Sequence, residues 1–196
     1  MTGAGSDDRA AFFAAFDSML QRWPADSQVV DLESDFGTTR VRIAGPADGP
    51  PLVLLHAYQA TSAEWVPLAG LLTGRYRLYA VDLIGDAGYS TAGRRTVSTP
   101  DDLVEYLDTV LDGLELPTAE LGGHSFGAWI ALTYGISRPA RVDRLVLLDP
   151  TMIVSPLLKG YVFRALPAMF TPTGASRLSL IRWETHKATS TNSGCG

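Results

Sequence analysis

The feature that most constrains this sequence is the pentapeptide Gly-His-Ser-Phe-Gly at residues 123–127, which separates two segments of different type. Residues 117–122 are predicted to form a short buried strand, and residues 128–134 are predicted to form a helix. A serine at such a corner has strained backbone angles and directs its hydroxyl out of the fold. The glycines on either side let strand and helix approach closely. The motif therefore predicts that Ser125 is a nucleophile.

Strands and helices alternate on both sides of this corner. Residues 52–55 and 145–148 are wholly apolar, which is typical of parallel strands that are covered on both faces. Further strands are predicted over residues 29–32, 38–43 and 76–81, and helices over residues 12–23, 61–72 and 100–114. The pattern predicts an α/β fold, with a mostly parallel sheet and helices on both faces.

Two of the predicted helices have recognisable start signals. Thr61 and Glu64 have the spacing of a capping box, and we expect Trp65, Leu68 and Leu72 on the inner face of the helix that follows. The segment Thr-Pro-Asp-Asp at residues 99–102 combines a cap residue, a proline at the first helical position and acidic residues in the first turn. The second signal predicts the clearest helix of the chain.

The regular alternation ends after residue 150. The expected organisation is an N-terminal helix over residues 1–25, a core over residues 26–150, a partial cap or lid over residues 151–186 and a disordered tail over residues 187–196. The tail is predicted to be disordered because its residues are small and polar.

Composition excludes several classes of protein. The net charge is -5, which gives no electrostatic reason to bind nucleic acid or an anionic membrane. Cys195 is the sole cysteine, so there is no internal disulfide and no cysteine-built metal site. The N-terminus lacks signal-peptide features, and no apolar run reaches the roughly 20 residues that span a bilayer. We expect a cytoplasmic protein with a small-molecule substrate and without metal or cofactor; the sequence indicates no oligomeric state.

Three motifs together resemble the α/β-hydrolase family, over nearly the whole chain. His56-Ala57-Tyr58 is similar to the family's His-Gly-x segment, with Ala57 in place of the usual glycine. Residues 82–90, Asp-Leu-Ile-Gly-Asp-Ala-Gly-Tyr-Ser, are similar to its Asp-x-x-Gly-x-Gly-x-Ser loop, and residues 123–127 to its nucleophile elbow. The resemblance implies a carboxylesterase-like enzyme in which Ser125 attacks an acyl carbonyl. The backbone N–H groups of Tyr58 and Phe126 would then stabilise the oxyanion.

Other polar residues of these motifs are expected to have structural roles. His56 and His124 occupy positions that in this family generally support loops and do not supply the catalytic base. Asp82 and Asp86 are expected to brace a loop through side-chain to backbone hydrogen bonds.

The acid and the histidine that complete a serine triad have no obvious counterpart. His186 is the sole histidine after Ser125, so Asp149 and His186 are the candidates. Three explanations stay open: a fragment or frameshifted product, a natural short relative that binds without turnover, or a second chain that supplies the missing part. The change near Lys187 to a Ser/Thr/Gly-rich tail favours the first. Without further strands, residues 145–148 would form an exposed apolar edge.

Alternative functions follow from the same residues. A serine nucleophile argues against the relatives that use aspartate, whereas perhydrolases and C–C bond hydrolases share these motifs. A non-catalytic protein that binds a small molecule in the same pocket is the alternative of a different class. A nucleotide-binding domain would need a glycine-rich phosphate loop, and residues 56–59 provide none.

Overall fold

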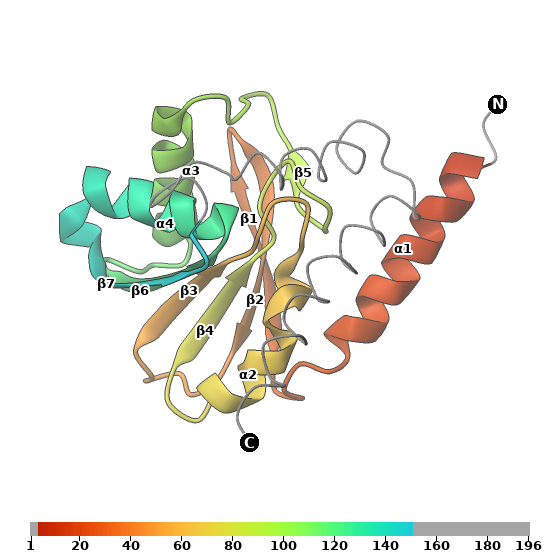
Figure 1. Cartoon of the computed structure of the whole chain (residues 1–196), viewed down its shortest axis with the longest axis horizontal. Coiled ribbons are helices and arrows are strands. Elements are labelled where there is room, and N and C mark those ends of the chain that lie inside the picture. Colours follow the sequence, from red (N-terminus) through yellow and green to blue (C-terminus); the bar gives the residue numbers. More distant parts are fainter. Residues whose placement is uncertain (1–3, 151–196) are drawn as a thin grey trace, which may run out of the picture. The chain divides into compact units, whose positions relative to one another are not determined.

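A seven-stranded sheet runs through the part of the chain that the structure describes (Figure 1). The structure is a computed structural model that describes residues 4–150, with side chains from residue 7. Its strands are β1 (Gln28–Ser34), β2 (Gly37–Ala44), β3 (Pro51–Leu55), β4 (Arg77–Val81), β5 (Thr91–Ala92), β6 (Ala119–His124) and β7 (Val142–Leu148). The predicted cap at 151–186 and the predicted tail at 187–196 lie outside the described residues.

The strand order is β1-β2-β4-β3-β6-β7, and β5 pairs with β2. Strands β3, β4, β6 and β7 are parallel to one another, and each antiparallel pairing involves β2. The helices are α1 (Ala4–Leu20), α2 (Val66–Leu72), α3 (Pro100–Gly113) and α4 (Phe126–Ser137), with short 3₁₀ turns at Ser62–Trp65 and Pro139–Arg141. The predicted α/β fold is confirmed; the short strand β5 was not predicted from the sequence.

The sheet divides the core into two apolar layers because side chains alternate along each strand. On β3, Val53 and Leu55 belong to the layer beneath α3 and α4, whereas Leu52 and Leu54 belong to the layer beneath α1 and α2. Figure 1 shows α3 and α4 on one side of the sheet and α2 on the other. Strand β3 is therefore covered on both faces, as its wholly apolar sequence predicts.

The N-terminus of α3 is capped as the sequence predicts. The Thr99 hydroxyl accepts a hydrogen bond from the Asp102 amide at 3.1 Å, and the Asp102 carboxylate accepts from the Thr99 amide at 3.0 Å. Hydrogen bonds from Thr99, and then from Arg95, lower the pKa of Asp102 to about 2. This closed capping box fixes the start of α3, which packs against β1 and α4.

The predicted helix over residues 61–72 is wrong in two respects. A 3₁₀ turn at Ser62–Trp65 precedes α2, and the Glu64 carboxylate does not return to Thr61. Trp65 is buried as predicted, whereas Leu68 is 37% exposed and Val66 and Ala69 are buried instead. Leu72 is partly buried and packs against the same apolar layer. The expected inner face is therefore wrong at Leu68.

Strand β7 is the last strand of the described sheet, and its apolar residues are partly exposed. Val146 and Leu148 are 40% and 41% exposed, as expected of an apolar edge without a further strand beside it. Within residues 4–150, no helix combines the length and apolar character that crossing a membrane requires.

Candidate functional site

Ser125 lies between β6 and α4 with an unusual backbone conformation. Its φ is 52° and its ψ is -110°, a combination that costs free energy for any residue with a side chain. Its N–H donates to the carbonyl of Leu148 on β7 at 2.9 Å, and its own carbonyl accepts from Ala128 and Trp129 in the first turn of α4. The predicted strained corner is confirmed, and these backbone bonds hold it in place.

The two glycines of the corner are required by close approach. A Cβ at Gly127 would fall within 3.0 Å of the carbonyl oxygens of Leu55 and His56, and a Cβ at Gly123 would meet the backbone of Gly127 equally closely. Real Cβ atoms do not approach backbone so closely. The corner therefore depends on the absence of side chains at Gly123 and Gly127, and not on hydrogen bonds from side chains.

The loop after β3 begins at His56, which is fully buried. Its Nε2 accepts a hydrogen bond from the Leu83 amide at 3.0 Å, so the proton of the neutral ring is on Nδ1. Nδ1 lies 2.8 Å from the carbonyl oxygen of Ala57 and donates to it. Both ring nitrogens have structural partners, in agreement with the expected supporting role.

Ala57 is fixed through both of its backbone polar groups. Its N–H donates to Glu64 Oε2 at 2.8 Å, and its carbonyl accepts from His56 and also from the Ala60 amide at 3.0 Å. Ala57 has no positive φ, so an alanine here requires no left-handed conformation. The replacement of the family's glycine is therefore accommodated by the backbone.

The amides of Tyr58 and Phe126 come from the two sides of the site. A trans peptide is planar, so the Tyr58 N–H points away from the Ala57 carbonyl that His56 and Ala60 hold. Within the described part of the chain, neither the Tyr58 amide nor the Phe126 amide donates a hydrogen bond. The aromatic rings of these two residues pack edge to face with centroids 6.0 Å apart. The structure thus brings together the two residues predicted to bind the oxyanion, although this role stays a prediction.

Asp82 and Asp86 brace the loops around the site, as expected. Asp82 accepts hydrogen bonds from the amides of Ser62 at 2.8 Å and Tyr89 at 3.3 Å. Asp86 accepts from the amide of Gln59 at 3.0 Å, where the backbone has a positive φ. Burial raises the pKa of Asp86, and the Gln59 hydrogen bond opposes that shift.

Glu64 is the residue of this region that sequence reasoning missed. One carboxylate oxygen accepts from Ala57, and the other contacts Nδ1 of His124, directly before Ser125. The capping-box spacing from Thr61 predicted only a local hydrogen bond for Glu64. Its partner His124 is 60 positions away in the sequence. The spacing of the residues therefore contained no signal for this contact.

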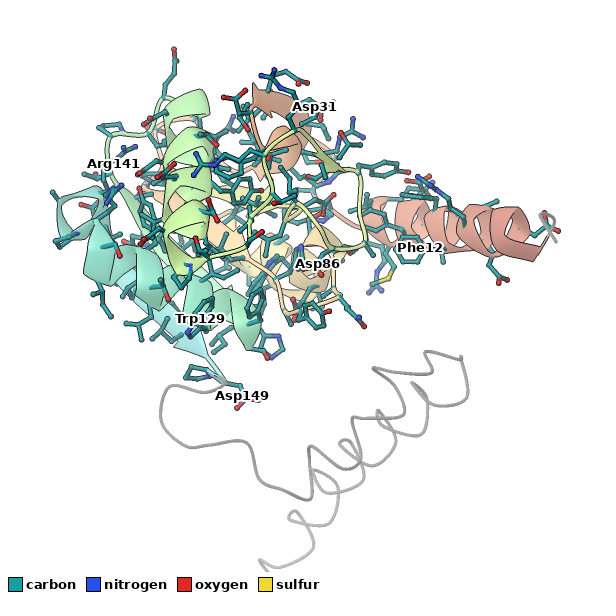
Figure 2. All side chains as sticks on the ribbon, turned by 90° about the horizontal axis from the view of Figure 1, so that it is seen from above. Phe12, Asp31, Asp86, Trp129, Arg141 and Asp149 are labelled. Carbon is teal, nitrogen blue, oxygen red and sulfur yellow. The ribbon has the colours of Figure 1, made fainter. Side chains whose placement is uncertain are left out.

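The candidate triad residues are not brought together by the described residues. Asp149 follows the Leu148 carbonyl that binds Ser125, has a φ of 44° and is exposed; Figure 2 labels it at the end of β7. His186 lies outside the described residues. The Asp149–His186 pair therefore stays a prediction.

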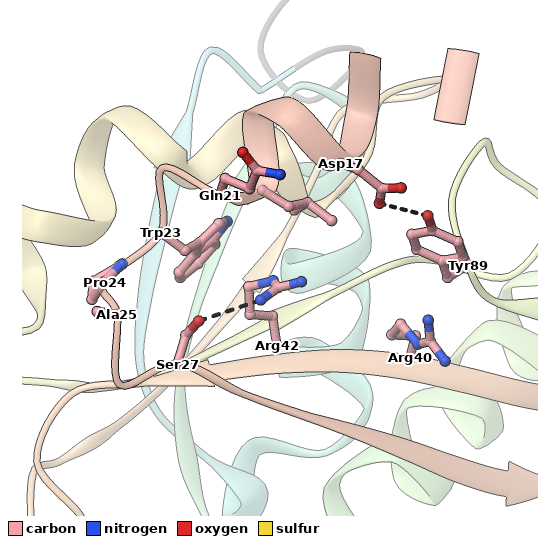
Figure 3. A pocket seen from close by; sticks show the side chains of 10 residues that line it. Asp17, Gln21, Trp23, Pro24, Ala25, Ser27, Arg40, Arg42 and Tyr89 are labelled. Carbon is pink, nitrogen blue, oxygen red and sulfur yellow. Dashed lines mark hydrogen bonds between the residues drawn. The ribbon is translucent and has the colours of Figure 1, made fainter. Parts of the chain in front are cut away.

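A hollow of about 690 Å³ lies elsewhere, between the end of α1 and β2 (Figure 3). Arg42 and Trp23 line it, and each carries a buried nitrogen that has no hydrogen-bond partner among the described residues. None of its lining residues belongs to the elbow or to the loop after β3. It is therefore separate from the site around Ser125.

Comparison with known proteins agrees with this geometry. The sequence model of the alpha/beta hydrolase fold family matches residues 50–173. Carboxylesterase YbfK of Bacillus subtilis is 35% identical over 150 residues, which cover 76% of this chain and 50% of that protein. An uncharacterized carboxylesterase, nap, of the same organism is 31% identical over 161 residues, covering 82% of this chain and 53% of that protein.

A solved structure gives the same result. The crystal structure of carboxylesterase CesB (YbfK) from Bacillus subtilis superposes with a TM-score of 0.83 at 30% identity, covering 90% of this chain and 61% of that chain. The chain spans about half the length of the curated relatives that it matches.

Proposed function

Because the chain belongs to the α/β-hydrolase fold family, we propose that it contributes the nucleophile and the oxyanion site of a carboxylesterase. Ser125 is the proposed nucleophile, and the amides of Tyr58 and Phe126 are the proposed oxyanion donors. The substrate class is a small-molecule carboxylic ester, which is the chemistry named for the relatives at 31% and 35% identity.

The reaction proceeds in two steps. The Ser125 oxygen attacks the ester carbonyl and forms a C–O bond, while its proton passes to a base. The carbonyl oxygen becomes an oxyanion, which accepts hydrogen bonds from the two amides. Collapse of this intermediate breaks the bond to the alcohol, which leaves with a proton. Water then hydrolyses the acyl-enzyme and releases the carboxylic acid.

One observation supports this proposal most directly: the strained Ser125 directly precedes Phe126, whose ring contacts the ring of Tyr58. Ser125 has a φ of 52°, and the amides of Tyr58 and Phe126 have no hydrogen-bond partner within residues 4–150. Unpaired donors cost free energy unless water or a ligand satisfies them. An oxyanion between the two amides would satisfy both.

A general base completes the proposed mechanism. Asp149 and His186 have the chain order of the acid and the base, and we propose them as that pair. Replacing His186 by Gln should then lower esterase activity without changing the unfolding midpoint of the protein.

Labelling with a fluorophosphonate tests the nucleophile. The probe forms a P–O bond with an activated serine and releases fluoride. Intact mass should show one adduct on the wild-type protein and none on the variant Ser125→Ala. Hydrolysis of p-nitrophenyl acetate, followed by absorbance, should show the same difference.

Two results would contradict the proposal. Equal labelling of Ser125→Ala would place the reactive group elsewhere. A folded wild-type protein that binds short esters, but is neither labelled nor active, would favour the non-catalytic binding alternative.

The proposal also includes a cytoplasmic location without nucleic-acid or membrane partners, and fractionation of the producing cells tests that location.

A further inference from the structure

Glu64 makes a polar contact with each side of the proposed oxyanion site. Its Oε2 accepts from the Ala57 amide at 2.8 Å, and its Oε1 contacts Nδ1 of His124. Ala57 precedes Tyr58, and His124 precedes Ser125. Each contact is therefore made one residue before a residue of the proposed reaction.

The position of Glu64 is itself fixed. It belongs to the 3₁₀ turn that Thr61 caps, and the Ser62 amide at the start of that turn is bound by buried Asp82. The next residue, Trp65, is 2% exposed in the apolar layer beneath α2. The carboxylate thus extends from a turn that is anchored to the core.

Partial burial strengthens both polar contacts of Glu64. Its side chain is 22% exposed and that of His124 is 36% exposed, so water competes incompletely for these hydrogen bonds. A charged acceptor forms stronger hydrogen bonds than a neutral one. Loss of the carboxylate would leave the Ala57 amide and the imidazole without their partner.

The effect on Tyr58 follows from peptide geometry. Glu64 fixes the peptide between His56 and Ala57, while His56 and the Ala60 amide hold the next peptide through the Ala57 carbonyl. That second peptide carries the Tyr58 N–H, and a planar peptide turns as a unit. Release of the first peptide removes one of the three hydrogen bonds that fix the Ala57 backbone, and so loosens the peptide that carries the Tyr58 N–H.

We infer that Glu64 is a positioning residue, which couples the Tyr58 amide to the Ser125 elbow through Ala57 and His124. This inference rests on the proposed function. Glu64 touches neither Ser125 nor the position of a substrate, so it is not a catalytic residue. Its role is to keep two amides from distant segments aimed at one oxyanion.

The experiment compares the variants Glu64→Leu and Glu64→Gln with the wild-type protein. Leu removes both contacts, whereas the Gln amide oxygen can still accept from Ala57. Misdirection of one oxyanion donor should lower the rate of Ser125 labelling by a fluorophosphonate about 10- to 100-fold in Glu64→Leu, and less than about 10-fold in Glu64→Gln. With p-nitrophenyl acetate, kcat should fall while KM changes less than about twofold.

A matched control is available on the strand that leads into the elbow. Glu120 also has a partly buried carboxylate in a hydrogen-bonded ion pair, with Arg144 at 3.0 Å, but it lies at the other end of β6. Glu120→Gln should label at the wild-type rate. Ser125 of the double variant Glu64→Leu/His124→Leu should be labelled no more slowly than Ser125 of Glu64→Leu, because both changes remove the same contact between Glu64 and His124.

Amide hydrogen exchange separates this inference from the proposed function. The Ala57 amide should exchange faster in Glu64→Leu than in the wild-type protein. If wild-type Ser125 is not labelled, the proposed function fails, and exchange at Ala57 alone decides the inference. If the Ala57 amide of Glu64→Leu then exchanged at the wild-type rate, the inference would be overturned. If the wild-type protein is labelled, equal labelling of Glu64→Leu overturns the inference, as does an equal loss in Glu120→Gln.

Discussion

The elbow at residues 123–127 and the loop at residues 56–60 are both proposed to supply an oxyanion donor, yet they are held in different ways. The elbow is held by backbone packing, because Gly123 and Gly127 leave no space for a Cβ. The loop is held by side chains that bind its backbone, from His56, Glu64 and Asp86. The first kind of constraint is steric and acts between backbone segments, whereas the second is polar and acts through side chains.

The largest expected effect tests the steric constraint on the elbow. Gly127→Ala would place a Cβ within 3.0 Å of two backbone carbonyl oxygens, and backbone cannot yield as a side chain does. We expect a loss of about 3 kcal/mol or more in the free energy of unfolding, measured in urea. Gly70→Ala in α2 is the control, because nothing lies within 4 Å of its added Cβ. An unfolding midpoint for Gly127→Ala equal to that of the control would refute the steric argument.

An intermediate effect is expected on the polar side. His56→Leu keeps the buried volume but leaves the Leu83 amide without an acceptor, which costs about 2 kcal/mol. His56→Gln can still accept at a similar position and should lose about half as much. Equal unfolding free energies for the two variants would show that the ring contributes packing and not hydrogen bonds.

The smallest effect tests a single charge at the edge of the loop. Burial raises the pKa of Asp86 above its unfolded value of about 3.9, so the folded state binds more protons between the two values. The contribution of Asp86 to stability is therefore present below the unfolded pKa and is lost as pH rises through the folded pKa. Asp86→Asn keeps an acceptor for the Gln59 amide and removes this dependence.

The difference in the free energy of unfolding between the wild-type protein and Asp86→Asn should therefore change with pH. Relative to the variant, the wild-type protein should be less stable at pH 7 than at pH 4, by less than about 1 kcal/mol, in urea unfolding at both pH values. Asp48→Asn makes the same change in charge at an exposed position. A stability difference that rises with pH would reverse the sign of the predicted shift.

The same contrast explains how much of the structure could be predicted from the sequence. The fold, the elbow and the α3 cap were predictable because each is encoded by neighbouring residues with a fixed pattern. The Gly-x-Ser-x-Gly order itself specifies the corner, and Thr99 with Asp102 specifies the cap. These local patterns describe most of residues 28–148.

Contacts between distant segments were not predictable in the same way. Glu64 fits a capping box by spacing, yet its carboxylate binds Ala57 and His124. The exposure of Leu68 was also not predicted, because no residue pattern indicates the 3₁₀ turn before α2. Side-chain partners across loops follow from the completed fold, and the sequence order does not specify them.

The aromatic stack beside the elbow gives the protein an optical property. The Phe126 and Trp129 rings are stacked with centroids 5.5 Å apart, one helical turn after Ser125 (Figure 2 labels Trp129). Trp23 and Trp65 are 4% and 2% exposed, whereas Trp129 is partly exposed. Among residues 7–150, Trp129 is the tryptophan that lies within one helical turn of Ser125, so we expect the proposed acylation of Ser125 to change its emission.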